Sequence, residues 1–409
     1  MEKPFMIPWL MLAVFLAGCR GNGPGKKPGA SSFGEDADFL RQHLKNVVVL
    51  QHTADSSQVL VSGDYQARVM TSTTGGRSGK SYGWINRPLI ASGSYRSHIN
   101  AYGGEERFWL GPEGGQYSLF FPKGSPFDFS NWQTPGLLDT AHFNLDNRTD
   151  ASVTYSKRAT LKNYAGADFD ITIIRRISLL DTIAFKKRTG IVLPAGISLV
   201  AYETENKLAN SGVQPWNEQT GLLSIWLLGM YQPSPKTVIA VPFRPLPQAT
   251  QFIHDDYFGK ISPQNLQIKD SLLLMKADGK SRGKIGLSPE VARPLAGSVD
   301  LETGSITLIC FSVAENGRYV NSKWEHQREP YKGDVLNCYN DGPLPDGSQL
   351  GPFYELESSS DTRALRPGDF IIYRQMTAHL EGDKAAMDQL SKMIWNRSLD
   401  EISRVFPDR

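Results

Sequence analysis

Cysteine is scarce in this chain, and the spacings typical of metal sites are missing. Three cysteines occur among 409 residues, at positions 19, 310 and 338. No Cys-x-x-Cys and no His-x-x-x-His spacing is present, so a zinc site is not expected. Two alternatives remain open for Cys310 and Cys338: a disulfide between them, or two separate buried thiols.

An excess of charge of either sign is also lacking. The 44 Lys and Arg residues are nearly matched by 42 Asp and Glu residues, and the formal net charge is +2. Domains that bind nucleic acid carry a strongly basic surface, so nucleic acid is not expected as a partner. Beyond the N-terminal segment, the longest apolar stretch runs from Gly221 to Tyr231. It is well short of the ~20 residues that a membrane-spanning helix needs.

What the chain does have is a targeting segment at its start. Lys3 precedes an apolar run from Phe5 to Gly18, which has the length of the hydrophobic region of a signal peptide. The run ends in Leu-Ala-Gly followed by Cys19, which resembles the lipobox of bacterial lipoproteins. The interpretation is a signal peptide over residues 1–18 and a lipid on Cys19. An ordinary secretory signal followed by a chance cysteine is the alternative.

Residues 19–34 are predicted to form a flexible tether. The stretch from Arg20 to Ser32 consists mostly of Gly, Pro, Lys and Ser, which cannot bury apolar surface. Several acyl chains on Cys19 would anchor the protein to a membrane outside the cytoplasm. No acidic cluster follows Cys19. This favours an outer-membrane lipoprotein that faces the periplasm and leaves surface exposure open.

Beyond the tether, short β-rich runs alternate with turn residues. The predicted strands are Val47–Gln51, Gln58–Ser62, Ala67–Thr73, Ala151–Ser156, Phe169–Ile177, Ile197–Glu203, Val238–Phe243, Leu272–Met275 and Ser305–Val313. Many strands punctuated by Gly, Pro and Asn are typical of an all-β, antiparallel fold. No later composition break resembles a linker, so residues 35–409 are predicted to form a single β-domain.

Helical periodicity is expected only near the two ends of this domain. Glu35 to Lys45 carries its apolar residues on one side. Near the C-terminus, residues from about 383 to 406 are predicted to be a helical extension that packs over one end of the sheets. Its second helix begins with Ser398 and Glu401, which are spaced as a capping box.

Two segments far apart in the chain resemble motifs of one fold family. The first, Asn100 to Gly115 (NAYGGEERFWLGPEGG), resembles the Gly-Gly-x-Arg-x-Trp-x-x-Pro-Glu segment of proteins with a galactose-mutarotase-like fold. The second, Phe353 to Asp369, contains FYELES and LRPGD and is similar to the Leu-Glu-Thr…Leu-Arg-Pro-Gly-Glu segment of aldose 1-epimerases. The run from Thr220 to Pro235 (TGLLSIWLLGMYQPSP) resembles a family of bacterial lipoproteins of unknown function.

The resemblance implies a galactose-mutarotase-like β-supersandwich from Val47 to about Leu380, with a sugar-binding cleft on a concave sheet face. In aldose 1-epimerases a glutamate takes the proton of the anomeric hydroxyl while a histidine protonates the ring oxygen. Glu357 stands at the position that matches this glutamate. Glu355, two residues earlier, would lie on the same face of a regular strand. Two such carboxylates can have well-separated pKa values, which suits acid–base work.

The histidine of the epimerases has no counterpart at the expected place. Their His-x-Tyr-Phe-Asn-Leu motif corresponds to Leu223–Tyr231, which contains Trp226 and no histidine. His98, His254 or His379 would have to substitute for it. This absence favours carbohydrate binding without turnover. The alternatives are a sugar-active enzyme, epimerase-like or lyase-like, with Glu357 as general base, and a structural envelope protein without a ligand.

The residues predicted to bind the sugar are Asn100, Glu105, Arg107, Trp109, Glu113 and Trp226. An indole plane can stack on a pyranose ring, although tryptophans are also common in the core of large β-proteins. The charges that flank Trp109 are costly to bury unpaired, so they should line a cleft or pair with one another. We expect Arg107 and Trp109 to meet Glu355 and Glu357 in one pocket. No cofactor is expected, and the expected partners are a carbohydrate and the membrane.

Overall fold

The computed structural model describes residues 31–52 and 55–407. The predicted signal peptide, Cys19 and all but the last residues of the predicted tether lie outside this range. The chain from Ser31 onward forms one compact unit. Within the described residues, no helix combines the length and the apolar character needed to cross a membrane.

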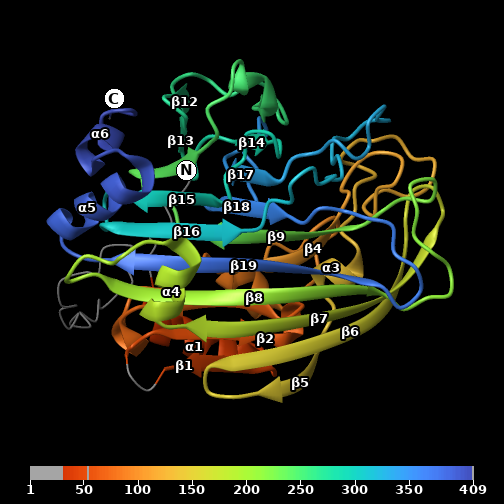
Figure 1. The fold of residues 1–409 in the computed structure, drawn as a ribbon. Coiled ribbons are helices and arrows are strands. Elements are labelled where there is room, and N and C mark those ends of the chain that lie inside the picture. Colours follow the sequence, from red (N-terminus) through yellow and green to blue (C-terminus); the bar gives the residue numbers. More distant parts are fainter. Residues whose placement is uncertain (1–30, 53–54, 408–409) are drawn as a thin grey trace, which may run out of the picture. The chain divides into compact units, whose positions relative to one another are not determined.

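Three antiparallel sheets make up this unit (Figure 1). The three-stranded sheet contains β1 (Val47–Gln51), β2 (Gln58–Ser62) and β3 (Arg68–Thr73). The ten-stranded sheet has the order β12 (Leu266–Lys269), β13 (Leu272–Lys276), β10 (Thr237–Pro242), β15 (Leu295–Asp300), β16 (Ser305–Phe311), β19 (Phe370–Glu381), β8 (Ser198–Asn210), β7 (Asp168–Leu180), β6 (Ser152–Lys162) and β5 (Asn144–Arg148). The six-stranded sheet has the order β11 (Ile253–His254), β14 (Gly283–Leu287), β17 (Leu336–Asn340), β18 (Tyr354–Ser359), β9 (Ser224–Tyr231) and β4 (Arg107–Gly111).

The predicted all-β, antiparallel architecture is therefore confirmed. Each of the nine predicted runs falls on a strand, namely β1, β2, β3, β6, β7, β8, β10, β13 and β16. The ten- and six-stranded sheets pack face to face around the largest apolar core. Polar side chains also join them, since Ser298 on β15 hydrogen-bonds the hydroxyl of Tyr354 on β18 at 2.8 Å.

The N-terminal helix begins earlier than predicted. Helix α1 runs from Phe33 to His43, within the last residues assigned to the tether. Ser32 caps it, because the Ser32 hydroxyl accepts from the Glu35 amide and the Glu35 carboxylate accepts from the Ser32 amide. The capping box, which the sequence analysis did not use here, sets this start.

The C-terminal helices agree with the prediction. Helix α5 (Lys384–Trp395) is followed by α6 (Leu399–Ser403), and Ser398 with Glu401 forms the expected capping box. Their apolar residues pack on the outer face of the ten-stranded sheet, as Figure 1 shows beside β15 and β16. The other α-helices of the described residues are α2 (Arg87–Ser92), α3 (Gly136–Asp139) and α4 (Thr182–Thr189).

Cys310 and Cys338 are two separate buried thiols. Cys310 lies on β16 in the cluster beneath the C-terminal helices, whereas Cys338 lies on β17 in the core between the sheets. Burial raises the pKa of the Cys310 thiol to about 12. The disulfide alternative is thus not realised.

Candidate functional site

The register of three neighbouring strands brings the two motif segments together. Arg107 on β4 is paired with Leu228 on β9, and Leu228 is paired with Glu357 on β18. Directly opposed residues of antiparallel strands project to the same face, so Arg107 and Glu357 share one face of the six-stranded sheet. Glu355, two residues from Glu357, lies on that face as well.

The opposite face of β18 belongs to the core. Leu356 is fully buried there, and the hydroxyl of Tyr354 reaches the ten-stranded sheet. This alternation is the one expected from the sequence, with carboxylates on one side and apolar residues on the other.

Two cations hold the two carboxylates on the site face. Arg107 Nη2 donates to Glu355 Oε1 at 2.5 Å. Lys284 Nζ of β14 and the indole Nε1 of Trp226 both donate to Glu357 Oε2 at 3.0 Å. Glu357 Oε1 and Arg107 Nε are buried without a hydrogen-bond partner in the described part of the chain. One acceptor and one donor of the site are therefore unsatisfied.

Two tryptophans complete this group of side chains. Trp109 and Trp226 meet edge to face with ring centroids 5.4 Å apart. The guanidinium carbon of Arg107 lies 4.7 Å from the centre of the Trp109 ring, and Lys284 Nζ lies 5.1 Å from that of Trp226. The Trp109 indole is fixed from α3, because its N–H donates to the carbonyl of Leu138 at 3.0 Å.

Glu113 is a third carboxylate of this group, and it interacts electrostatically with Lys284 and Glu357. Burial raises its pKa to about 7, against the lowering effect of Lys284, and the charge of Glu357 raises it further. Burial likewise raises the pKa of Glu355 to about 8, although Arg107 opposes this. For Lys284, burial lowers the pKa, but the carboxylates around it outweigh burial and raise it.

We call these residues the charged cluster: Arg107, Trp109, Glu113, Trp226, Lys284, Glu355 and Glu357. Unlike the open cleft that the resemblance implied, the cluster is covered. Glu357 is 0% exposed and Glu355 is 6% exposed. Rings from the loops lie over this face, among them Phe120 against Trp109 and Trp132 against Trp324. The cluster approaches the surface at Glu113 and Lys284, whose side chains are partly exposed.

Of the three histidines considered as a substitute acid, His254 lies on the face of the charged cluster. It is paired with Gly286, two residues from Lys284 on β14. Its Nδ1 contacts the carboxylate of Asp334 at 2.9 Å, and that hydrogen bond raises the pKa of His254. The Tyr257 hydroxyl donates to the same carboxylate at 2.6 Å. The centre of the Tyr257 ring lies 5.8 Å from Lys284 Nζ.

Glu105 does not join the charged cluster. It is buried between the sheets, where it accepts from Ser72 and from the Tyr202 hydroxyl and contacts His379 Nε2 at 3.0 Å. The chain at this point bridges to β3 before β4 begins, so strand alternation does not extend back to Glu105. Glu105 was predicted to lie in one pocket with Arg107 and Trp109, and the structure corrects this, because Glu105 lies outside that group of side chains.

Asn100 also lies apart from the charged cluster. Its side-chain amide donates to Asp139 at 2.7 Å, and its backbone amide donates to the same carboxylate. Asp139 ends α3, the helix whose Leu138 carbonyl holds the Trp109 indole. Asn100 therefore supports the loop behind the cluster. The third histidine, His98, contacts the Trp132 carbonyl in the neighbouring loop.

Lys284 is the member of the cluster that the sequence analysis missed. It stands in Gly283-Lys284-Ile285-Gly286-Leu287, a short strand in which it is the single charge. Strand alternation, which had placed Glu355 on the face of Glu357, is a signal that Lys284 carries as well, as a charge between apolar residues of a strand.

The antiparallel all-β architecture expected from the sequence is present, and the solved structures that are similar to this chain include galactose mutarotase-like proteins. The chain belongs to a family of unknown function (DUF6786), whose model matches residues 31–406. Among proteins with curated descriptions, none matches this chain in sequence.

Two solved structures illustrate the similarity. A galactose mutarotase-like protein from Lactobacillus casei is 10% identical, with 82% of this chain and 99% of that chain covered and a TM-score of 0.44. A GalM/aldose epimerase homologue from C. elegans is 11% identical, with 82% and 99% covered and a TM-score of 0.47. At such identities the role of any side chain has to rest on this chain's own geometry.

Proposed function

We propose that this protein is an envelope lipoprotein that binds a carbohydrate at the charged cluster. The observation that carries the proposal is the placement of Arg107, Lys284 and the carboxylates beside two tryptophans on one sheet face. Sugar hydroxyls can donate to carboxylates and accept from cations, and the apolar side of a pyranose can pack on an indole. The unpartnered Glu357 Oε1 and Arg107 Nε offer an acceptor and a donor for such a ligand.

A ligand reaches these atoms through the rim of the charged cluster, which is the part where its side chains are partly exposed. Lys284 and Glu113 reach the surface there, next to Tyr257. A sugar that enters at this rim has to displace covering rings such as that of Trp324. We therefore expect binding to be accompanied by rearrangement of the loops over the sheet.

A sugar-active enzyme is the second candidate, and the carboxyl groups favour it. The pKa of Glu113 is raised to about 7 and that of Glu355 to about 8, so both can exchange protons near neutral pH. In this reading Glu357 is the general base of an epimerase-like or lyase-like reaction. We prefer binding without turnover because His254 is engaged by Asp334 rather than by the Glu355–Glu357 pair.

Glu357→Gln is expected to weaken sugar binding about tenfold or more. The substitution removes the charge that Lys284 and Trp226 orient, and a hydrogen bond to a charged group is worth about 1.5–3 kcal/mol. Ligands from a thermal-shift screen of mono- and oligosaccharides would be titrated by calorimetry. Glu205→Gln, in an exposed ion pair with Arg374, is the matched control and should bind as the wild type does.

Two results would contradict this assignment. One is a screen in which no sugar shifts the melting temperature of the folded wild-type protein. The other is equal affinity of the wild type and the Glu357→Gln variant for the same ligand. Release of a converted sugar by the wild type, lost in Glu357→Gln, would favour the enzyme instead.

Cys19→Ala is expected to move the protein from the membrane fraction to the soluble envelope fraction. The reason is that acyl chains on Cys19 are the proposed anchor. Fractionation followed by immunoblotting measures the change, and Cys310→Ala, at a buried free thiol, is the control. Retention of the Cys19→Ala variant in the membrane fraction would show that the lipobox interpretation is wrong.

A further inference from the structure

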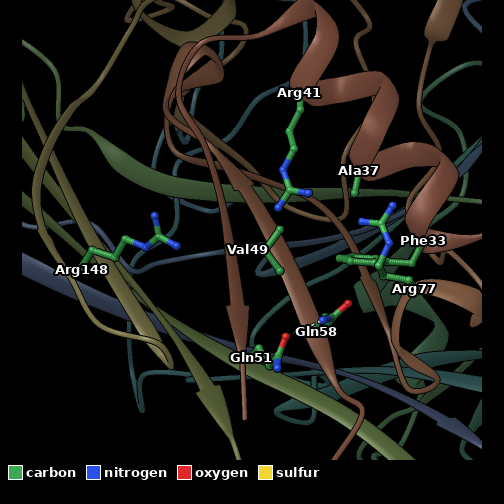
Figure 2. A pocket seen from close by; sticks show the side chains of 8 residues that line it. All are labelled: Phe33, Ala37, Arg41, Val49, Gln51, Gln58, Arg77 and Arg148. Atoms are coloured by element: carbon green, nitrogen blue, oxygen red, sulfur yellow. Dashed lines mark hydrogen bonds between the residues drawn. The ribbon is translucent and has the colours of Figure 1, made fainter. Parts of the chain in front are cut away.

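A hollow of about 330 Å³ lies between α1 and the three-stranded sheet (Figure 2). Its lining comes from α1, from β1 and β2, from the turn at Gly76–Ser78 and from β5. None of these residues belongs to the charged cluster. The volume falls in the range of about 300–1,000 Å³ typical of small-molecule sites.

Three arginines from three different elements line this hollow: Arg41 of α1, Arg77 of the turn and Arg148 of β5. Figure 2 shows the guanidinium groups of Arg41 and Arg148 directed toward Val49 from two sides. Arg77 is paired with Asp38 at 2.7 Å. The guanidinium groups of Arg41 and Arg148 make no ion pair or hydrogen bond within residues 31–52 and 55–407. Arg41 and Arg148, both exposed to solvent, thus line the hollow without a counter-charge from the described residues.

Two glutamines lie at one side of the same hollow. Gln51 and Gln58 are opposite each other in the pairing of β1 with β2, and Gln58 Nε2 donates to Gln51 Oε1 at 2.6 Å. Gln58 Oε1 is buried and lacks a hydrogen-bond partner in the described chain. An unsatisfied buried acceptor is costly, so a ligand that donates a hydrogen bond to Gln58 Oε1, for example from a hydroxyl, would be stabilised here.

We propose that this hollow is a second binding site, which takes an acidic sugar of the hexuronate class. The carboxylate lies between the guanidinium groups of Arg41 and Arg148, whose planar donor forks match carboxylates. A ring hydroxyl donates to Gln58 Oε1, and Val49 contacts the apolar part of the ring. A simple anion would satisfy the arginines alone, and a neutral sugar would satisfy the glutamine alone.

The test is calorimetric titration of the purified protein with glucuronate, glucose and inorganic phosphate. Wild type is expected to bind glucuronate at least tenfold more tightly than the other two probes. Arg41→Gln and Arg148→Gln should each weaken glucuronate binding at least tenfold without changing the melting temperature. Arg176→Gln, an exposed arginine on β7, is the control and should bind as wild type does. Higher ionic strength should weaken the binding.

Several outcomes would overturn the proposal. Absence of glucuronate binding, or affinity unchanged in both arginine variants, removes the site. Phosphate that binds as tightly as glucuronate removes the sugar and leaves a simple anion site. Binding to phosphatidylglycerol vesicles that depends on Arg41 and Arg148, without glucuronate binding, assigns the hollow to a lipid headgroup. The charged cluster is not altered in any of these variants, so its own sugar binding is tested separately.

Discussion

Arg175→Met is expected to lower the free energy of unfolding by about 3–5 kcal/mol, the cost of breaking a buried ion pair from one side. Arg175 on β7 pairs with Glu106 at 2.9 Å, and both side chains are fully buried between the sheets. Without the guanidinium, the Glu106 carboxylate keeps a neutral donor, Gln375, at 2.9 Å. Because burial already raises the pKa of Glu106, protonation can relieve part of the cost, and the loss should be smaller at acidic pH.

The double variant Arg175→Met/Glu106→Gln distinguishes the charge from the packing. Gln at position 106 keeps a carbonyl for Gln375 and removes the stranded charge, so most of the lost stability should return. Urea denaturation followed by circular dichroism measures all three free energies. Arg374→Met, at an exposed pair with Glu205, is the surface control and should cost less than about 1 kcal/mol. A double variant no more stable than the single one would refute this account.

Stability is expected to fall as the pH rises from about 4.5 to about 7, and Glu113→Gln should flatten that fall. Burial raises the pKa of folded Glu113 to about 7 against an ordinary value of 4.5, with Lys284 opposing and Glu357 assisting. Between these values the folded state binds more protons than the unfolded state. Its stabilising contribution is therefore complete below about pH 4.5 and is lost through pH 7, on the order of 1 kcal/mol per pH unit.

The measurement is the melting temperature of wild type and Glu113→Gln across this pH range. Gln stands in for the protonated acid. The melting temperature of the variant should therefore be close to that of wild type at acidic pH and higher than that of wild type at neutral pH. Glu355, whose pKa is raised to about 8 mainly by burial, contributes in the same direction and leaves a residual slope. Glu325→Gln, at an exposed position, is the control. A slope unchanged by Glu113→Gln would exclude this residue as its source.

The strands that were predicted from the sequence are runs rich in β-branched residues, such as β10 and β16, which are buried at every residue. Val47–Gln51 has the predicted bounds because burial alternates along it. Every residue of β9 is buried as well, so no alternation marks it as a strand, and Ile225 is its single β-branched residue. Strand β4 was not predicted for the same reason, because all its residues are buried and none is β-branched.

The site was predictable only in part. Alternation placed Glu355 and Glu357 on one face, and the cost of burying unpaired charges suggested that Arg107 would meet them across a separation of 248 residues. Lys284 was missed because β14 is short and contains two glycines. The covering of the cleft was not foreseen, because the rings of Phe120, Trp132 and Trp324 come from irregular segments that carry no periodic signal.

The order of strands in the six-stranded sheet governs when it can form. β9 is hydrogen-bonded to β4 on one side and to β18 on the other, and more than a hundred residues separate it from each. Closing such loops is entropically expensive before any contact compensates, which slows folding relative to helical domains. During synthesis, β9 stays without one of its two neighbours until the ribosome has passed Ser359. The charged cluster, which draws on all three strands, therefore assembles only when nearly the whole polypeptide exists.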